Sequence, residues 1–342
     1  MNAIGGKPRI ALDLMGGDHA PHAAIEGCML ALEKHTPVIA LGTAEAVELL
    51  ISKVQDPNLT SVVCNQVITS EESPVRAVRT KSDSTIVRGL TMVKNKEASA
   101  FVSAGSTGAL LAGGVLILGR AEGVDRPCLG MVLPSKNDRG VLVMDLGASA
   151  DVQPQNLIEF ALMGKIYAER VLGWDDPRVG LLNIGTEANK GTATTKKAYT
   201  LLENAPLNFI GNVEARDVFF DKADIIITDG FTGNILLKTC EGALLFQISN
   251  LKKAVESNFR SKMGALLLRP ALYDLVNTLD YSNFGGAPML GLEGCVVKCH
   301  GSSDAVAIAN GVAQAVRFIE SNVASVICET LAEMGLRSVN HD

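Results

Sequence analysis

The sequence predicts an α/β protein in which helices cover both faces of a mainly parallel sheet. Short β-branched runs alternate with amphipathic segments along most of the 342 residues, and this alternation is typical of βαβ units. Hydrophobic residues make up 47% of the chain, so it can bury a substantial core as one large unit or as two domains. In such sheets ligands bind at the carboxyl ends of the strands, where we expect the functional site.

The predicted strands are short apolar runs that are bounded by turn residues. They lie at residues 9–12, 37–41, 61–64, 100–102, 141–144, 179–182 and 225–227. The helices predicted between them are the amphipathic segments 23–32, 84–94, 157–171 and 194–202.

Turns rich in glycine, serine and asparagine follow several of these strands. Because the carboxyl ends of parallel strands meet at one edge of a sheet, we expect the turns to line one large cleft. Glycine lets the backbone approach a ligand closely, and hydroxyl and amide groups donate hydrogen bonds to anions. The candidate ligand-binding residues in these turns are Asp13, Gly16, Gly17, Ser103, Gly105, Ser106, Thr107, Asn183 and Gly185.

Residues 225–238 combine a predicted strand, a glycine-containing turn and the start of a helix. Thr232 and Asn234 flank Gly233 and are candidate N-caps, and the free N–H groups of a helix start attract anions. Lys238 follows Asn234 by four residues, so both lie on the same side of the helix. We expect an anion site here; the alternative is an ordinary capped turn between a strand and a helix.

Two further segments carry groups suited to an anion or to proton transfer. Lys190 lies in a glycine turn with Asn183, where it is either a cation of the site or a solvated loop lysine. His300 precedes Gly301 and a helix that begins near Asp304. It is either a general acid or base near neutral pH or a structural histidine beside a helix.

The sequence lacks the signatures of several enzyme classes. No G-x-G-x-x-G follows a strand, and in residues 185–192 the lysine precedes the second glycine, contrary to a Walker loop. A net charge of −6 and an aromatic fraction of 4% disfavour nucleic-acid binding. The chain starts without a signal-peptide core, has no long uninterrupted apolar run, and places its 7 cysteines in no zinc or disulfide pattern. We therefore expect a cytoplasmic protein.

Residues 235–280 predict a long helical hairpin. Its first helix reaches a basic stretch around residues 252–262, and the apolar residues 263–268 follow, before Pro270. We expect Leu266, Leu267 and Leu268 at the tip of the hairpin. The tip is either a dimer or core contact, or it dips into a membrane surface, where leucines insert and lysines meet anionic headgroups.

These motifs, in this order, resemble the bacterial phosphate acyltransferase (PlsX) family, and the resemblance extends over roughly residues 9–318. The segments that carry it are residues 11–18, 102–109, 126–127, 145–148, 183–191, 229–234, 285–292 and 300–304. Ser106 and Ser149 depart from the commoner family residues, but each keeps a hydrogen-bonding oxygen.

The resemblance implies a fold, a reaction and partners. The fold is a single three-layer α/β/α domain in two lobes over residues 1–342, similar to isopropylmalate dehydrogenases and phosphotransacetylases. The reaction moves an acyl group from acyl carrier protein (ACP) to inorganic phosphate, and the acyl phosphate enters phospholipid synthesis. Lys190 and Asn234 match the family's active-site lysine and asparagine. A homodimer and peripheral attachment to the membrane through the hairpin tip are also implied.

The wider relatives bear on cofactors. In the dehydrogenases, acidic residues at the matching helix start hold a divalent metal. Asn234 and Lys238 stand at positions that resemble those acids, and an amide and an ammonium group suit phosphate better than Mg²⁺. We therefore expect neither a metal ion nor another cofactor.

Our mechanistic hypothesis is direct attack of phosphate on a thioester without a covalent enzyme intermediate, with Lys190 supplying charge and Asn234 a directed hydrogen bond. One rival is a phosphotransacetylase that acts on acyl-CoA. The other is a non-catalytic scaffold that holds ACP at the membrane. We expect no nucleic-acid partner.

Overall fold

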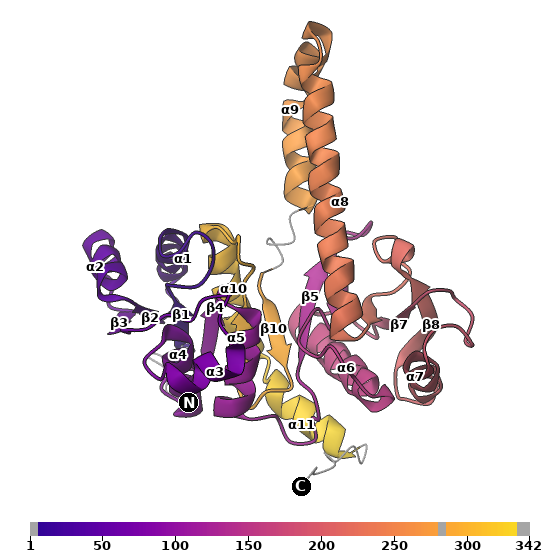
Figure 1. Ribbon diagram of the computed structural model, residues 1–342, viewed down its shortest axis with the longest axis horizontal. Coiled ribbons are helices and arrows are strands. Elements are labelled where there is room, and N and C mark those ends of the chain that lie inside the picture. The colour runs from indigo at the N-terminus through magenta and orange to yellow at the C-terminus, as the bar shows by residue number, and fades with distance from the viewer. Residues whose placement is uncertain (1–5, 280–284, 334–342) are drawn as a thin grey trace.

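The computed structural model describes residues 6–279 and 285–333 and places an 11-stranded sheet at the centre of the molecule (Figure 1). The strands are β1 (Ile10–Asp13), β2 (Val38–Gly42), β3 (Leu59–Val63), β4 (Ala100–Ser103), β5 (Cys128–Leu133), β6 (Val141–Met144), β7 (Arg178–Asn183), β8 (Asn208–Glu214), β9 (Ile225–Ile227), β10 (Ala287–Leu290) and β11 (Cys295–Lys298).

Helices cover both faces of this sheet, as predicted. They are α1 (His22–Glu33), α2 (Ala44–Lys53), α3 (Pro74–Thr80), α4 (Thr85–Lys94), α5 (Thr107–Gly113), α6 (Pro154–Tyr167), α7 (Ala193–Glu203), α8 (Gly230–Glu256), α9 (Phe259–Leu279), α10 (Ala305–Glu320) and α11 (Val323–Glu333). Short π-helical turns, Gly114–Leu118 and Ala168–Leu172, extend α5 and α6, and a 3₁₀ turn occupies Ala215–Asp217.

Each strand and helix predicted from the sequence is present, but β5, β8, β10 and β11 were not predicted. Gly130 lies inside β5, Gly211 inside β8 and Pro288 inside β10. Glycine and proline inside a strand weaken the sequence pattern that marks it. The β11 strand has four residues and ends in a lysine, which interrupts its apolar run.

The sheet consists of two parallel halves joined by two antiparallel strands. The strand order is β3-β2-β1-β4-β11-β10-β5-β6-β9-β7-β8, and β10 and β5 are antiparallel to their neighbours. Three reversals in a row make the strands of one half run against those of the other. The register at the join places Lys298 opposite Ala287, Met289 opposite Leu129, and Met144 opposite Gly130. The two halves approach the join from opposite directions and end there in this register. Their carboxyl ends therefore meet at the join, and the turns that follow them face one another.

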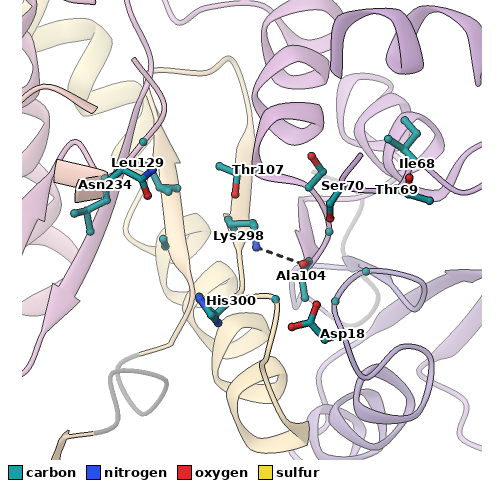
Figure 2. Close-up of a pocket in the computed structure, with 18 of the residues that line it drawn as sticks. Asp18, Ile68, Thr69, Ser70, Ala104, Thr107, Leu129, Asn234, Lys298 and His300 are labelled. Carbon is teal, nitrogen blue, oxygen red and sulfur yellow. Dashed lines mark hydrogen bonds between the residues drawn. The ribbon is translucent and has the colours of Figure 1, made fainter. Parts of the chain in front are cut away.

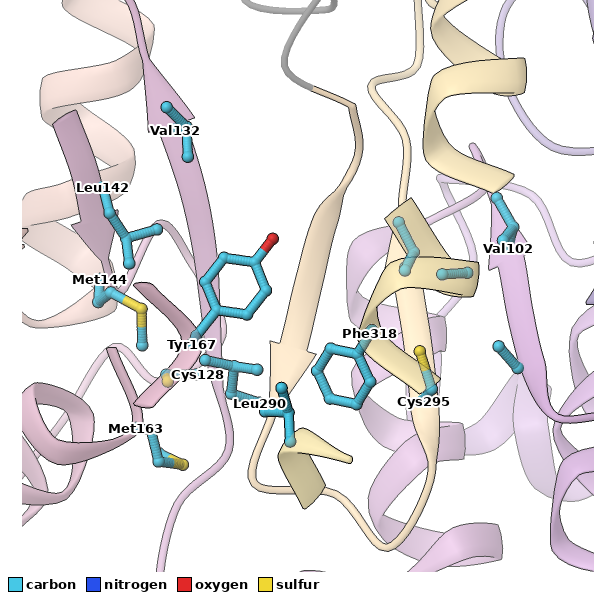
Figure 3. Close-up of a cluster of buried hydrophobic side chains, with 14 of the residues drawn as sticks. Val102, Cys128, Val132, Leu142, Met144, Met163, Tyr167, Leu290, Cys295 and Phe318 are labelled. Atoms are coloured by element: carbon cyan, nitrogen blue, oxygen red, sulfur yellow. The ribbon is translucent and has the colours of Figure 1, made fainter. Parts of the chain in front are cut away.

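Side chains of the strands alternate between two cores, one on each face of the sheet. Ile10 and Leu12 of β1 belong to the core under α1, α6 and α10, whereas Ala11 belongs to the core under α4 and α5. This burial on both faces is typical of a parallel sheet covered by helices. Near the join, Tyr167 of α6 packs against Phe318 of α10 with ring centroids 6.5 Å apart (Figure 3). Since α6 covers the second half of the sheet and α10 the first, this contact ties the two halves together.

The helices α8 and α9 pack against each other and project away from the sheet (Figure 1). Asn258 caps α9, since its Oδ1 accepts a hydrogen bond from Ser261 N at 2.9 Å. The turn of the hairpin therefore lies at residues 257–258, and the prediction that residues 263–268 form the tip is wrong. These residues lie inside α9, which also contains Pro270, because Asn258 already caps the helix before them.

The predicted end of the hairpin, residue 280, lies outside the described residues. In the part of the chain that the structure describes, α8 and α9 included, no helix has the length and hydropathy needed to cross a bilayer.

Candidate active site

A cavity of about 570 Å³ opens where the carboxyl ends of the two halves meet (Figure 2). Turns after β1, β4 and β11 line it from one half, and β5, the turn after β6 and the start of α8 line it from the other. The structure thus brings together many of the residues predicted from separate turns. These are Gly16, Gly17, Gly105, Ser106, Thr107, Asn234, Lys238, His300 and Gly301.

Asp13 and Ser103 lie beneath the cavity and hold its turns in place, rather than lining it as predicted. The carboxylate of Asp13 accepts hydrogen bonds from Met15 N at 2.9 Å and from Ser103 Oγ at 2.7 Å. Ser103 Oγ accepts one from Gly105 N at 2.9 Å. Burial raises the pKa of Asp13, although these hydrogen bonds oppose the shift. The two turns pack so closely that a Cβ on Gly16 would lie 2.5 Å from Gly105 N.

Asp145 holds the turn after β6 in place through hydrogen bonds. Its carboxylate accepts four backbone hydrogen bonds, from the N–H groups of Leu129, Gly147, Ala148 and Ser149 at 2.6–3.2 Å. Burial raises the pKa of Asp145 to about 6, against these hydrogen bonds. The turn that Asp145 shapes presents Gly147 to the cavity. Ser149, which departs from the commoner family residue, is buried in this turn and donates a hydrogen bond to Pro127 O at 3.0 Å.

The start of α8 differs from the predicted anion site. Asp229, not Thr232 or Asn234, is the N-cap: its carboxylate accepts hydrogen bonds from Thr232 N at 2.7 Å and Thr232 Oγ1 at 2.8 Å. Gly230 N donates to Ser149 O at 2.8 Å. These two amides are therefore already occupied, and a capping carboxylate repels an anion. The side chains of Asn234 and Lys238 are the polar groups that α8 presents to the cavity.

Gly233 is required for this packing, because a Cβ there would lie 1.9 Å from Asp145 O. The glycine lets α8 start directly on the turn after β6 and brings Asn234 against Gly147, which has a φ of +128°. The glycine of the predicted anion site thus serves close packing rather than ligand binding.

The helix α8 separates two cavities. Asn234 and Lys238 line the main cavity, whereas Thr232 lines a second, largely apolar one of about 580 Å³ on the other side of the helix. Asn183 also lines the second cavity, and its Nδ2 donates to Lys190 O at 3.1 Å. Lys190 is exposed, its side chain lies over Gly185, and it lines neither cavity. Within one chain, Lys190 and Asn234 therefore do not share a cavity, contrary to the predicted arrangement.

Lys298 is a residue of the main cavity that the sequence reading missed. It ends β11, is 8% exposed, and its Nζ donates hydrogen bonds to Ala104 O at 3.3 Å and to Cys299 O (Figure 2). Burial lowers the pKa of Lys298 to about 8. The signal that could have revealed it is a lysine at the end of an apolar run, two residues before His300.

His300 is held in a small polar cluster at the edge of the cavity. Its Nδ1 accepts a hydrogen bond from Ser302 N at 3.2 Å, which places the ring hydrogen of the neutral form on Nε2. Nε2 lies 3.4 Å from Glu241, whose other oxygen lies 2.8 Å from Lys238 Nζ. Burial lowers the pKa of His300. This geometry favours a positioning role for His300 over proton transfer to a substrate.

The cavity offers an anion several hydrogen-bond donors: the ammonium groups of Lys238 and Lys298, the hydroxyl of Thr107 and the amide of Asn234. Asp18 and Glu71 are the carboxylates in its lining. Across residues 6–279 and 285–333, no group of three or more histidine, cysteine or carboxylate side chains is placed to hold a metal ion.

Known structures share this fold. A phosphotransacetylase from Streptococcus pyogenes superposes with a TM-score of 0.60 and 18% sequence identity, covering 93% of this chain and 95% of that one. A branched-chain phosphotransacylase from Enterococcus faecalis superposes with a TM-score of 0.55 and 13% identity, covering 91% and 99%. The predicted α/β/α fold of the phosphotransacetylase type is thereby confirmed.

Sequence relatives are closer. The family model described as "Fatty acid synthesis protein" matches residues 8–326. The phosphate acyltransferase of Caldicellulosiruptor saccharolyticus is 46% identical over 328 residues, covering 94% of this chain and 98% of the relative. That of Clostridioides difficile is 43% identical over 337 residues, covering 98% and 99%. The resemblance drawn from the motifs is thereby confirmed, and the chain belongs to the phosphate acyltransferase (PlsX) family.

Proposed function

We propose that this protein transfers a long-chain acyl group from ACP to inorganic phosphate in the main cavity. Family membership supports the transfer of an acyl group to phosphate for phospholipid synthesis. ACP as the donor and a long acyl chain are the finer part of the proposal. The products are acyl phosphate and the free thiol of the carrier.

The observation that carries the proposal is the mixed lining of the main cavity. Lys298, Asn234 and Thr107 offer hydrogen-bond donors to phosphate, while Leu129 and Leu146 offer apolar surface to the acyl end of a thioester. The cavity, at about 570 Å³, has the size of a small-molecule site. Phosphate and thioester can therefore occupy it side by side.

The reaction needs little chemistry from the protein. A phosphate oxygen attacks the carbonyl carbon of the thioester, a C–O bond forms, the C–S bond breaks, and the departing thiolate takes up a proton. Holding the two reactants together is worth about 7–11 kcal/mol in favourable cases. Asn234 is placed to donate a hydrogen bond to the phosphate or to the developing oxyanion, and one such donor is worth about 3 kcal/mol.

Lys190 belongs to the proposal through the family resemblance alone. Its segment, residues 183–191, matches the family's active-site motif, although in one chain α8 stands between this segment and the main cavity. The proposed catalytic pair remains Lys190 and Asn234, and their separate variants test it.

The hairpin supports a membrane contact and a second copy of the chain as partners. On α9, Phe259, Met263 and Leu267 follow one another at four-residue spacing and are 77%, 45% and 80% exposed, so they form one apolar stripe. On α8, Leu245 and Phe246 are 68% and 64% exposed. Apolar surface of this kind marks an interface with a membrane or a protein. The exposed basic residues of the hairpin suit anionic headgroups or acidic ACP, and they are Lys252, Lys253, Arg260, Lys262 and Arg269.

The decisive experiment is incubation with palmitoyl-ACP and inorganic phosphate, with acyl phosphate as the measured product. We expect phosphate-dependent product that is insensitive to added Mg²⁺. Faster turnover of acetyl-CoA than of palmitoyl-ACP would replace the proposal with a phosphotransacetylase. Binding of ACP and liposomes without phosphate-dependent loss of thioester would replace it with a scaffold.

A further inference from the structure

We propose that Lys298 is the residue that binds inorganic phosphate in the main cavity, with two of its N–H groups held by backbone carbonyls and the third donated to a phosphate oxygen. This inference rests on the proposed function, because it names the group by which that site holds its anionic reactant.

Backbone carbonyls hold the ammonium group of Lys298 in place. An ammonium group has three N–H donors, and Lys298 Nζ uses two of them on Ala104 O and Cys299 O. These carbonyls belong to the turns after β4 and β11, so the nitrogen is fixed where the two turns meet. Figure 2 shows it among Asp18, Thr107 and His300 in the cavity lining. One donor is left for a ligand, and the rigid strand behind it fixes its position.

The ammonium charge of Lys298 is buried. Lys298 is 8% exposed, and among the described residues no carboxylate oxygen lies within the 4.0 Å of an ion pair from its Nζ. A buried charge without a partner is costly, and an anion that enters the cavity offsets the cost. Lys238, by contrast, is 57% exposed and pairs with Glu241 at 2.8 Å. Of the two cavity lysines, Lys298 is the one whose charge needs the ligand.

The pKa of Lys298 links phosphate binding to pH. Burial lowers the pKa of Lys298 to about 8, and Lys238 acts in the same direction, while Cys299, Asp18 and Asp13 oppose it. Burial raises the pKa of the Cys299 thiol to about 11 and lowers that of His300. Between pH 7 and 9 the buried thiol and the imidazole therefore stay neutral. Lys298 loses its charge as the pH rises through this window, and phosphate affinity should fall with it.

The test compares Lys298→Met and Lys298→Arg with the wild type. Phosphate KM, thioester KM and kcat are measured from pH 7 to 9, and phosphate binding is measured separately by calorimetry. Lys298→Met should raise the phosphate KM and Kd by about 10- to 100-fold, the worth of a hydrogen bond to a charged group, and leave the thioester KM within about twofold. Lys94→Met, at an exposed site on α4, is the matched control.

The pH profile separates a binding role from a structural one. The wild-type phosphate KM should rise roughly tenfold by pH 9, one unit above the Lys298 pKa. In Lys298→Arg the rise should vanish, because a guanidinium keeps its charge throughout this range. Circular dichroism and thermal unfolding establish that both variants are folded.

Three outcomes decide the matter. A folded Lys298→Met protein that binds phosphate as the wild type does overturns the inference while the proposed reaction stands. Lys298-dependent phosphate binding without any acyl phosphate overturns the proposed reaction and leaves the inference intact. Absence of phosphate binding in the wild type, by calorimetry and by kinetics, overturns both.

Discussion

Asn234 is positioned by its neighbours rather than by the helix start to which it belongs. Gly233 allows α8 to lie against Asp145, and Gly147, beside Asn234, has a φ of +128°, a backbone conformation that residues with a side chain rarely adopt. One glycine needed for close packing and one needed for its backbone conformation thus place one amide in the main cavity. Lys190 has no comparable support, since it is exposed in the turn after β7.

We expect Asn234→Ala to lower kcat by about 100-fold, because removal of one directed donor has this effect in acyl transfer. Lys190→Ala should lower kcat by at least about 100-fold as well if the family resemblance holds for this residue. Both are measured as initial rates of acyl-phosphate formation, beside Asn95→Ala as an exposed control. Near-normal turnover by a folded Lys190→Ala enzyme would remove Lys190 from the catalytic role.

Asp145 should matter for stability more than any other polar residue around the cavity. Its carboxylate accepts four backbone hydrogen bonds in the interior. An asparagine keeps one oxygen and turns an NH₂ group toward backbone donors. Asp145→Asn should therefore lower the free energy of unfolding by about 2–4 kcal/mol at pH 7. Urea unfolding measures it, with the exposed Asp151→Asn as the control, and equal midpoints for the two variants would contradict the prediction.

At the scale of elements, local sequence predicted helices and strands well where apolar periodicity was unbroken. It was wrong about the turn of the hairpin, because the apolar residues 263–268 are followed by Pro270, and proline commonly ends a helix. The helix α9 begins before residues 263–268, since Asn258 caps it. Exposed apolar side chains do not end a helix, so α9 continues through these residues. It was also wrong about the cap of α8, where Asp229 takes the role given to Thr232 and Asn234.

The place of Leu266 and Leu268 on α9 allows a test of the membrane contact. Leu266 and Leu268 lie about 12–15 Å along α9 from the turn, so they flank the apolar stripe rather than form an end. Leu266→Glu combined with Leu268→Glu should abolish flotation with anionic liposomes and spare turnover in solution, because the main cavity lies at the base of α8. Gln247→Glu, an exposed polar position on α8, is the control.

Gel filtration of the same variants separates the two interpretations of the hairpin. Unchanged flotation together with a shift to a smaller species would identify the leucines as a dimer contact instead of a membrane contact.

At the scale of the whole molecule, the sequence predicted the cleft but not its composition. Glycine turns after β1, β4 and β6 were recognised because each follows an obvious strand. Lys298 was missed because it ends a strand that was not predicted and because the reversal through β10 and β5 is invisible to periodicity. The separation of Lys190 from Asn234 could not be foreseen either, since it depends on which face of α8 each turn meets.

The join between β10 and β5 has a mechanical consequence. Among the described residues, two pairs, Met289 with Leu129 and Leu290 with Cys128, connect these strands in register, while most of the cavity's turns follow the parallel strands of one half or the other. A rotation about this join would change the distance between Lys298 and Asn234, and it would have to shift the contact between Tyr167 and Phe318 that ties the two halves together. Because Leu129 belongs both to this join and to the cavity lining, we expect substitutions at the join to change the fit of phosphate and thioester as well as the packing of the two halves.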